Sequence, residues 1–93
     1  MPDCRAPVAV FDSGLGGISV LRELVRTLPR ENYLYFGDSL HAPYGTKTPQ
    51  EVVDLSLQAA DRLLSQGAKA LVVACNTATS AAIRTLRKTY PEL

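Results

Sequence analysis

The sequence predicts a three-layer α/β domain, in which consecutive βα units build a parallel sheet between helices. Short apolar runs alternate three times with longer segments whose apolar residues recur at helical spacing. The first and third runs, residues 7–11 and 70–74, are apolar throughout, which is typical of strands buried on both faces. Right-handed crossovers between such units pack the helices against the faces of one sheet.

The first βα unit consists of the strand at residues 7–11, a glycine-rich turn at residues 12–17 and a helix that begins at Ile18. Pro29 closes this helix, because proline cannot continue the helical hydrogen bonds. The apolar residues expected to share one helix face and to cover the sheet are Ile18, Leu21, Leu24, Val25 and Leu28.

The second unit starts with an aromatic-rich strand at residues 32–37, followed by a longer loop. Its helix has a strong start signal. Thr48 is placed to cap the helix, Pro49 fits its first turn and Glu51 completes a capping box. Gly67 is placed to end the helix in a left-handed turn. The apolar stripe of this helix is expected to be Val53, Leu57, Ala60 and Leu64.

The third unit consists of the strand at residues 70–74 and a helix at residues 77–89, which Pro91 stops. Its expected inward-facing residues are Ala82, Ile83, Leu86 and Tyr90. A fourth strand normally follows in such folds, and a three-stranded parallel sheet is small. We therefore expect residues 1–93 to be a single, incomplete α/β domain of a larger protein.

The composition argues against several classes of partner. Ten Lys and Arg face nine Asp and Glu, so the formal charge of +1 gives no electrostatic case for nucleic acid or an anionic membrane surface. No apolar run approaches the roughly 20 residues of a membrane span, and the N-terminus lacks the layout of a secretion signal. The two cysteines lie far apart in sequence, so neither a disulfide framework nor a metal site is expected. These features favour the cytoplasm.

Polar residues follow all three predicted strands, at the edge where ligands bind in open α/β sheets. They are Asp12-Ser13-Gly14, Asp38-Ser39 and Cys75-Asn76-Thr77. The glycine-rich turn departs from the dinucleotide fingerprint, because Ser19 stands where the third glycine is required, and it lacks the lysine of a P-loop. A tight strand-to-helix turn explains its glycines, so nucleotide binding is not favoured here.

Cys75 is the strongest candidate for chemistry. A lone cysteine is more often a core thiol than a functional one. Cys75, however, follows a buried strand and precedes a helix whose N-terminal amides favour a thiolate. A thiolate there can act as a nucleophile or as a general base. Cys4 lies in the N-terminal lead-in, lacks such a setting and is expected to be a bland thiol.

The loop after the second strand contains three further polar residues. His41 can pair with a thiolate, but no orienting partner is visible in the sequence, which favours a surface-loop histidine. The hydroxyl of Tyr44 either faces a substrate or belongs to a packed aromatic ring. Asp38 is expected to cap the turn that follows the strand.

Four segments resemble, in sequence, order and spacing, the motifs of glutamate racemases. They are residues 11–17, 37–38, 43–45 and 74–78, which read FDSGLGG, GD, PYG and ACNTA. Each segment alone is a weak signal, but the four together are specific. The resemblance covers the chain from about Pro7 onward.

The resemblance implies a cofactor-independent isomerase that interconverts L- and D-glutamate and supplies D-glutamate for peptidoglycan. In this family two cysteines flank the α-carbon of the substrate, and one removes the proton that the other replaces from the far side. Cys75 matches the cysteine that deprotonates D-glutamate, and Asp12 matches the acid that assists it. The positions that match substrate-binding residues are Ser13, Pro43, Tyr44, Gly45, Asn76 and Thr77.

The second cysteine of the family lies in a Gly-Cys-Thr-His segment that residues 1–93 do not contain. The resemblance therefore implies the N-terminal half of a two-domain, homodimeric enzyme, and we expect residues 1–93 alone to be inactive. Two alternatives remain open. One is a racemase for aspartate or another amino acid, and the other is a non-catalytic fragment that binds a ligand or a protein through its open sheet edge.

Overall fold

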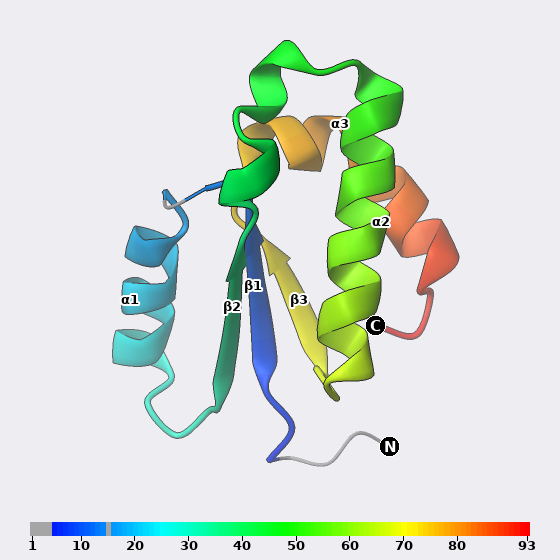
Figure 1. Ribbon diagram of the computed structural model, residues 1–93. Coiled ribbons are helices and arrows are strands. Elements are labelled where there is room, and N and C mark those ends of the chain that lie inside the picture. The colour runs from blue at the N-terminus through cyan, green and yellow to red at the C-terminus, as the bar shows by residue number, and fades with distance from the viewer. Residues whose placement is uncertain (1–4, 15) are drawn as a thin grey trace.

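Three parallel strands form a single sheet in the order β2-β1-β3 (Figure 1). The computed structural model describes residues 5–14 and 16–93. The strands are β1 (Val8–Asp12), β2 (Tyr33–Gly37) and β3 (Ala70–Val73). The helices are α1 (Ile18–Thr27), α2 (Pro49–Ser65) and α3 (Asn76–Thr89), with two short 3-10 turns, Ser39–His41 and Tyr44–Thr46, between β2 and α2.

β1 is the central strand, and its neighbours explain its continuous apolarity. Phe11 pairs with Phe36 on one side and with Val73 on the other. Ala9, Val10 and Phe11 are fully buried. Successive side chains of a strand point to opposite faces, so burial of all three residues requires cover on both faces of the sheet. This matches the buried strand that the sequence predicts.

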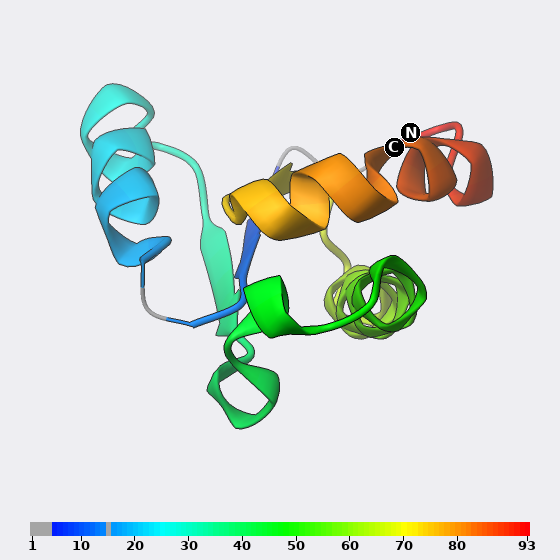
Figure 2. The ribbon, with the colours of Figure 1, turned by 90° about the horizontal axis from the view of Figure 1, so that it is seen from above.

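The helices cover both faces of the sheet. Figure 2 shows α1 on one side of the strands and α2 with α3 on the other. The chain steps from β1 to β2 in one direction and then back across β1 to β3. Right-handed crossovers therefore place α1 and α2 on opposite faces. The predicted three-layer α/β architecture is confirmed, and α3 packs against α2 through Ala60, Ala82 and Leu86.

The start and the end of α2 follow the sequence signals. The backbone N–H of Glu51 donates to Thr48 Oγ1 at 3.2 Å, and the backbone N–H of Thr48 donates to Glu51 Oε1 at 3.1 Å. Pro49 occupies the first turn. Gly67 follows the helix with φ of 89°, a conformation that strains any residue with a β-carbon. The predicted capping box and left-handed turn are both confirmed.

The buried face of α2 differs from the predicted stripe. Of that stripe only Ala60 is buried, whereas Val53 and Leu57 pack at the margin of the contact with α3 and Leu64 is half-buried. The helix contacts the sheet and α3 together, so its buried face is centred about one residue earlier than the apolar spacing indicates. The buried residues are Val52, Ser56, Ala59, Ala60 and Leu63.

The predicted apolar face of α1 covers the sheet only in part, since Leu21 and Leu24 are half-buried. None of the residues of α1 is buried, and Ile18 and Val25 are 42% and 45% exposed. Figure 2 shows α1 alone on its side of the sheet, with no neighbouring helix to complete a core there. In α3 the prediction is closer, because Ala82 and Leu86 are buried.

No helix in the part of the chain that the structure describes has both the length and the apolarity needed to cross a membrane.

Candidate active site

The loops that follow β1 and β3 meet at the carboxyl edge of the sheet, as the sequence predicts. The Sγ atom of Cys75 lies 3.3 Å from Ser13 Oγ, although the two residues are 62 positions apart. Parallel pairing of β1 with β3 makes this contact, because it aligns the ends of the two strands. Figure 1 shows the same edge, where the loops after all three strands gather at the top of the sheet.

Cys75 caps α3. Its Sγ accepts the backbone N–H of Ala78 at 3.4 Å, and its carbonyl accepts the backbone N–H of Thr79 at 2.9 Å. Its thiol donates to Ser13 Oγ, and the residue is 8% exposed. The sulfur therefore lies at the positive end of a 14-residue helix, within reach of a backbone N–H of its first turn.

Asp12 holds the turn between β1 and α1. One carboxylate oxygen accepts the backbone N–H of Ser13 at 2.7 Å, and the other accepts the backbone N–H of Gly17. The residue is buried, and the described residues include no hydrogen bond between Asp12 and Cys75. In this geometry Asp12 therefore contacts the turn that carries Ser13 and not the thiol itself.

The ring of Tyr44 is a packed core aromatic rather than an exposed one. Tyr44 is 1% exposed, and its ring lies 6.1 Å from that of Phe11. Its hydroxyl donates to Asp38 Oδ2 at 2.6 Å. Burial, together with the Asp38 carboxylate, raises the pKa of Tyr44, so its hydroxyl stays a donor. Of the two alternatives for Tyr44, the structure shows the packed one, with its hydroxyl bound to a protein carboxylate.

His41 and Asp38 differ from the prediction. His41 does have an orienting partner, because its Nδ1 lies 2.8 Å from Asp38 Oδ1. Asp38 makes no capping bond to the turn that it precedes, because both of its oxygens are used by side chains. Burial raises the pKa of Asp38, but the hydrogen bonds from Tyr44 and His41 outweigh it and hold that pKa below the ordinary value.

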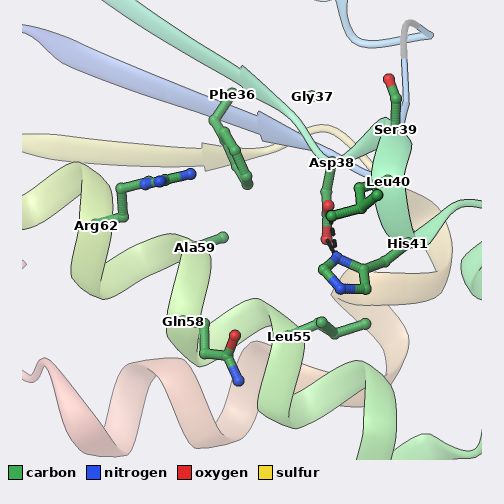
Figure 3. A pocket seen from close by; sticks show the side chains of 10 residues that line it. All are labelled: Phe36, Gly37, Asp38, Ser39, Leu40, His41, Leu55, Gln58, Ala59 and Arg62. Carbon is green, nitrogen blue, oxygen red and sulfur yellow. Dashed lines mark hydrogen bonds and ion pairs between the residues drawn. The ribbon is translucent and has the colours of Figure 1, made fainter.

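A cavity of about 450 Å³ opens beside this pair (Figure 3). The side chains of Asp38 and His41 point toward each other in one wall of the cavity. The Cζ atom of Arg62 lies over the ring of Phe36, 5.4 Å from the ring centroid. None of the residues that line the cavity is among those predicted to bind substrate.

A second cavity, of about 630 Å³, lies at the start of α3. Asn76 and Thr77 line it, and so does Lys47, which the sequence analysis did not single out. Only two residues separate Lys47 from Tyr44, and this nearness to the Pro-Tyr-Gly segment is the one feature of the sequence that could have indicated Lys47 as a site residue. Asn76 is exposed and Thr77 half-buried, so both can reach a ligand in this space.

The remaining predicted site residues lie on the surface next to these groups. Pro43 and Gly45 are exposed on either side of Tyr44, and the carbonyl of Pro43 accepts the hydroxyl of Thr46 at 3.1 Å. Cys4 lies outside the described residues. Within residues 5–14 and 16–93, no group of three or more His, Cys, Asp or Glu side chains is placed to hold a metal ion.

This arrangement can exchange a proton with a carbon acid. A thiol at a helix start is a group that can act as a base, and the exposed Asn76 amide with the half-buried hydroxyls of Ser13 and Thr77 can bind the carboxylates of a substrate.

Comparison with known proteins places these residues in context. No protein-family model matches the chain. The chain is 59% identical to the glutamate racemase of Clostridium perfringens, over 96% of this chain and 34% of that protein. It is 62% identical to the glutamate racemase of Bifidobacterium animalis subsp. lactis, over 91% of this chain and 33% of that protein. The chain thus spans about a third of the length of the curated relatives it matches.

Solved structures give the same match. The glutamate racemase of Thermus thermophilus in complex with β-chloro-D-alanine superposes with a TM-score of 0.90 at 53% identity, over 94% of this chain and 34% of that one. The Francisella tularensis enzyme in complex with D-glutamate gives a TM-score of 0.88 at 37% identity, over 92% of this chain and 33% of that one. Escherichia coli glutamate racemase, in complex with L-glutamate and the activator UDP-MurNAc-ala, gives a TM-score of 0.83 at 34% identity, over 89% of this chain and 32% of that one.

Proposed function

We propose that this chain, a homologue of the N-terminal third of glutamate racemases, supplies one side of the active site of an isomerase that interconverts L- and D-glutamate. One observation carries the proposal. Cys75 caps α3 within hydrogen-bond reach of Ser13, in a chain 53% identical to the Thermus thermophilus racemase. The reaction uses no cofactor, and the enzyme is a cytoplasmic homodimer that supplies D-glutamate for peptidoglycan.

In the proposed reaction Cys75 is the base for D-glutamate. Its thiolate takes the α-proton, so the C–H bond breaks, an S–H bond forms and the electron pair stays on the substrate as a carbanion. A cysteine outside residues 1–93 then delivers a proton to the opposite face, and the reverse sequence converts L-glutamate. The amides at the start of α3 stabilise the thiolate that each cycle regenerates.

The carbanion requires dense hydrogen-bond donors, because the α-proton of an amino acid is a very weak acid. The side chains of Asn76, which is exposed, and of Ser13 and Thr77, which are half-buried, supply such donors beside Cys75. The proposed substrate-binding residues are Ser13, Pro43, Tyr44, Gly45, Asn76 and Thr77. With the Tyr44 hydroxyl bound to Asp38, Tyr44 contributes its backbone N–H. Asp12 assists by holding the turn of Ser13 and by placing a negative charge behind it.

A chimera tests this function. This chain replaces the corresponding third of the Thermus thermophilus racemase, and racemisation is followed in both directions by circular dichroism. We expect turnover in the chimera. We expect Cys75→Ser to lower it roughly a hundredfold to ten-thousandfold, because a serine hydroxyl is too weak a base. The matched control is Cys4→Ser, which should keep normal turnover.

Two outcomes would contradict the proposal. A folded chimera that binds neither enantiomer of glutamate would favour the non-catalytic alternative. Near-normal turnover of Cys75→Ser would reduce Cys75 to a core thiol.

A further inference from the structure

The turn that carries Ser13 receives a hydrogen bond from strand β2. The hydroxyl of Tyr35 donates to the backbone carbonyl of Gly14 at 2.9 Å. Tyr35 lies in the middle of β2, opposite Val10 in the sheet register, and its side chain reaches 21 residues back along the sequence. The turn is therefore tied to the strand next to it and not only to its own Asp12.

The end of β2 fits the same carbonyl closely. A β-carbon added at Gly37 would lie 2.1 Å from the Gly14 carbonyl oxygen, far closer than two such atoms can approach. Only glycine at position 37 lets the turn lie where it does. The Tyr35 hydroxyl thus binds the carbonyl of Gly14 in the space that the missing side chain of Gly37 leaves.

This contact is one residue away from the thiol's partner. Ser13 precedes Gly14, and its hydroxyl accepts the hydrogen bond of the Cys75 thiol at 3.3 Å. Cys75 is 8% exposed, and the Ser13 side chain contacts its sulfur. Because Ser13 and Gly14 are adjacent in the turn, we expect a displacement of the Gly14 carbonyl to shift the hydroxyl that faces the sulfur.

We propose that Tyr35 and Gly37 form a clamp on the Gly14 carbonyl, and that Tyr35 is a positioning residue which sets the Ser13 hydroxyl against Cys75. As a statement about catalysis, this rests on the proposed racemase function. As a statement about the position of the turn, it stands on the contacts of residues 13, 14, 35, 37 and 75 alone.

The ionisation of Tyr35 fits this role. Burial and the neighbouring charge of Asp12 raise the pKa of Tyr35 above its ordinary value. The hydroxyl therefore keeps its proton, and remains a donor, over the whole range near neutral pH.

Strand β2 contains a matched control. Tyr33 lies two residues before Tyr35, on the same face of the sheet, and its hydroxyl also donates to backbone carbonyls. Its acceptors are Leu24 at 2.9 Å and Leu28 at 2.8 Å, at the end of α1 and away from the site. Tyr33→Phe and Tyr35→Phe therefore remove the same atom from the same strand, but only one of them releases the turn.

The first experiment measures the alkylation of Cys75 by iodoacetamide in the 93-residue chain, read by mass spectrometry of the Cys75 peptide. Tyr35→Phe should raise the alkylation rate about threefold to tenfold, because the loss of one hydrogen bond favours opening of the turn by that factor. Both the lost cover and the lost bond from the thiol act in this direction. Gly37→Ala should raise the rate further, and Tyr33→Phe should leave it unchanged. Equal rates in Tyr35→Phe and Tyr33→Phe would overturn the clamp.

The second experiment measures racemisation in the Thermus thermophilus chimera. Tyr35→Phe should raise the KM for glutamate about threefold to tenfold with little change in kcat, because the turn binds substrate and Cys75 itself stays on α3. Tyr33→Phe should keep both parameters. A KM that is the same in the two variants would overturn the positioning role. An inactive unsubstituted chimera would instead contradict the proposed function, and the alkylation rates would still decide the clamp.

Discussion

The carboxylate of Asp38 accepts hydrogen bonds from two side chains that follow it in the sequence, Tyr44 and His41. The residue is 6% exposed, and a buried carboxylate is costly unless donors satisfy it. Both donors belong to the loop that contains the Pro-Tyr-Gly segment. Asp38 therefore anchors this loop to the end of β2, next to the place where substrate is proposed to bind.

This anchor predicts a dependence of stability on acid. The pKa of Asp38 in the folded chain is below its ordinary value of 3.8, so its contribution is complete above that value and is lost as the pH falls through the folded pKa. Tyr44→Phe removes one donor and should lower the free energy of unfolding by about 1.5 to 3 kcal/mol at neutral pH. The difference from the unsubstituted chain should shrink in acid. The free energies of unfolding of the two chains are measured by urea denaturation at neutral pH and again at a pH below 3.8.

The control for this prediction is Tyr90→Phe, because Tyr90 is half-buried at the end of α3 and far along the chain from the anchor. A loss of stability in Tyr44→Phe that is the same at every pH would contradict the anchor.

Asp12→Asn should have a milder effect on racemisation than Cys75→Ser. The carboxylate accepts two backbone N–H groups, and an amide side chain can accept only one of them while its own NH₂ faces the other. In the chimera we expect kcat/KM to fall roughly tenfold to a hundredfold, the weight of a hydrogen bond to a charged group. The affinity for glutamate, measured by calorimetry, should largely persist. An effect as large as that of Cys75→Ser would mean that Asp12 takes part in the proton transfer itself.

Sequence reasoning reached the residues of the site that are marked locally. A cysteine between a buried strand and a helix predicts a thiol at a helix start, and Cys75 is found there. It did not reach Tyr35 or the link between His41 and Asp38. Those contacts depend on the sheet register and on the path of a long loop, which no short-range pattern encodes.

Among the elements, α2 and α1 show the difference between local and tertiary determinants. The start of α2 is set by three adjacent residues, so its capping box could be predicted. The burial of a helix face depends instead on which neighbours are present. For that reason the predicted stripe of α2 is displaced by one residue, and the apolar face predicted for α1 is only half-buried at Leu21 and Leu24 and exposed at its other residues.

The capping box gives a prediction at this scale. Thr48→Ala removes the acceptor for the Glu51 backbone N–H and should lower the free energy of unfolding by about 1 kcal/mol. The matched control is Thr27→Ala, because Thr27 is the exposed last residue of α1 and does not cap the start of a helix. Urea denaturation of the two variants measures the difference. An equal effect in both would show that the cap contributes nothing specific.

At the scale of the whole molecule, the sheet formed by the described residues has an unpaired edge on each side. β2 and β3 are edge strands, and three of the apolar residues of α1 and its end are more than 40% exposed: Ile18, Val25 and Leu28. A 93-residue chain that leaves these apolar side chains exposed buries too little apolar surface for high stability.

The 93-residue chain should therefore unfold with a free energy at or below about 5 kcal/mol, and it should associate as its concentration rises. Urea denaturation at several concentrations, together with sedimentation velocity, tests both points. A monomer that unfolds in one sharp transition independent of concentration would contradict them. The same chain within the chimera should gain stability, because the open faces acquire neighbours.

A ribosome makes β1 first, yet the order β2-β1-β3 gives that strand its second partner only when β3 emerges. Ser13 likewise waits for Cys75, 62 residues later in synthesis. At ordinary rates of translation that wait is roughly 3 to 12 seconds. During this time the apolar strand β1 has at least one unpaired edge, and the nascent chain is accessible to chaperones and to mispairing with other chains. The central place of β1 therefore makes the contact between Ser13 and Cys75 one of the last parts of this chain to form.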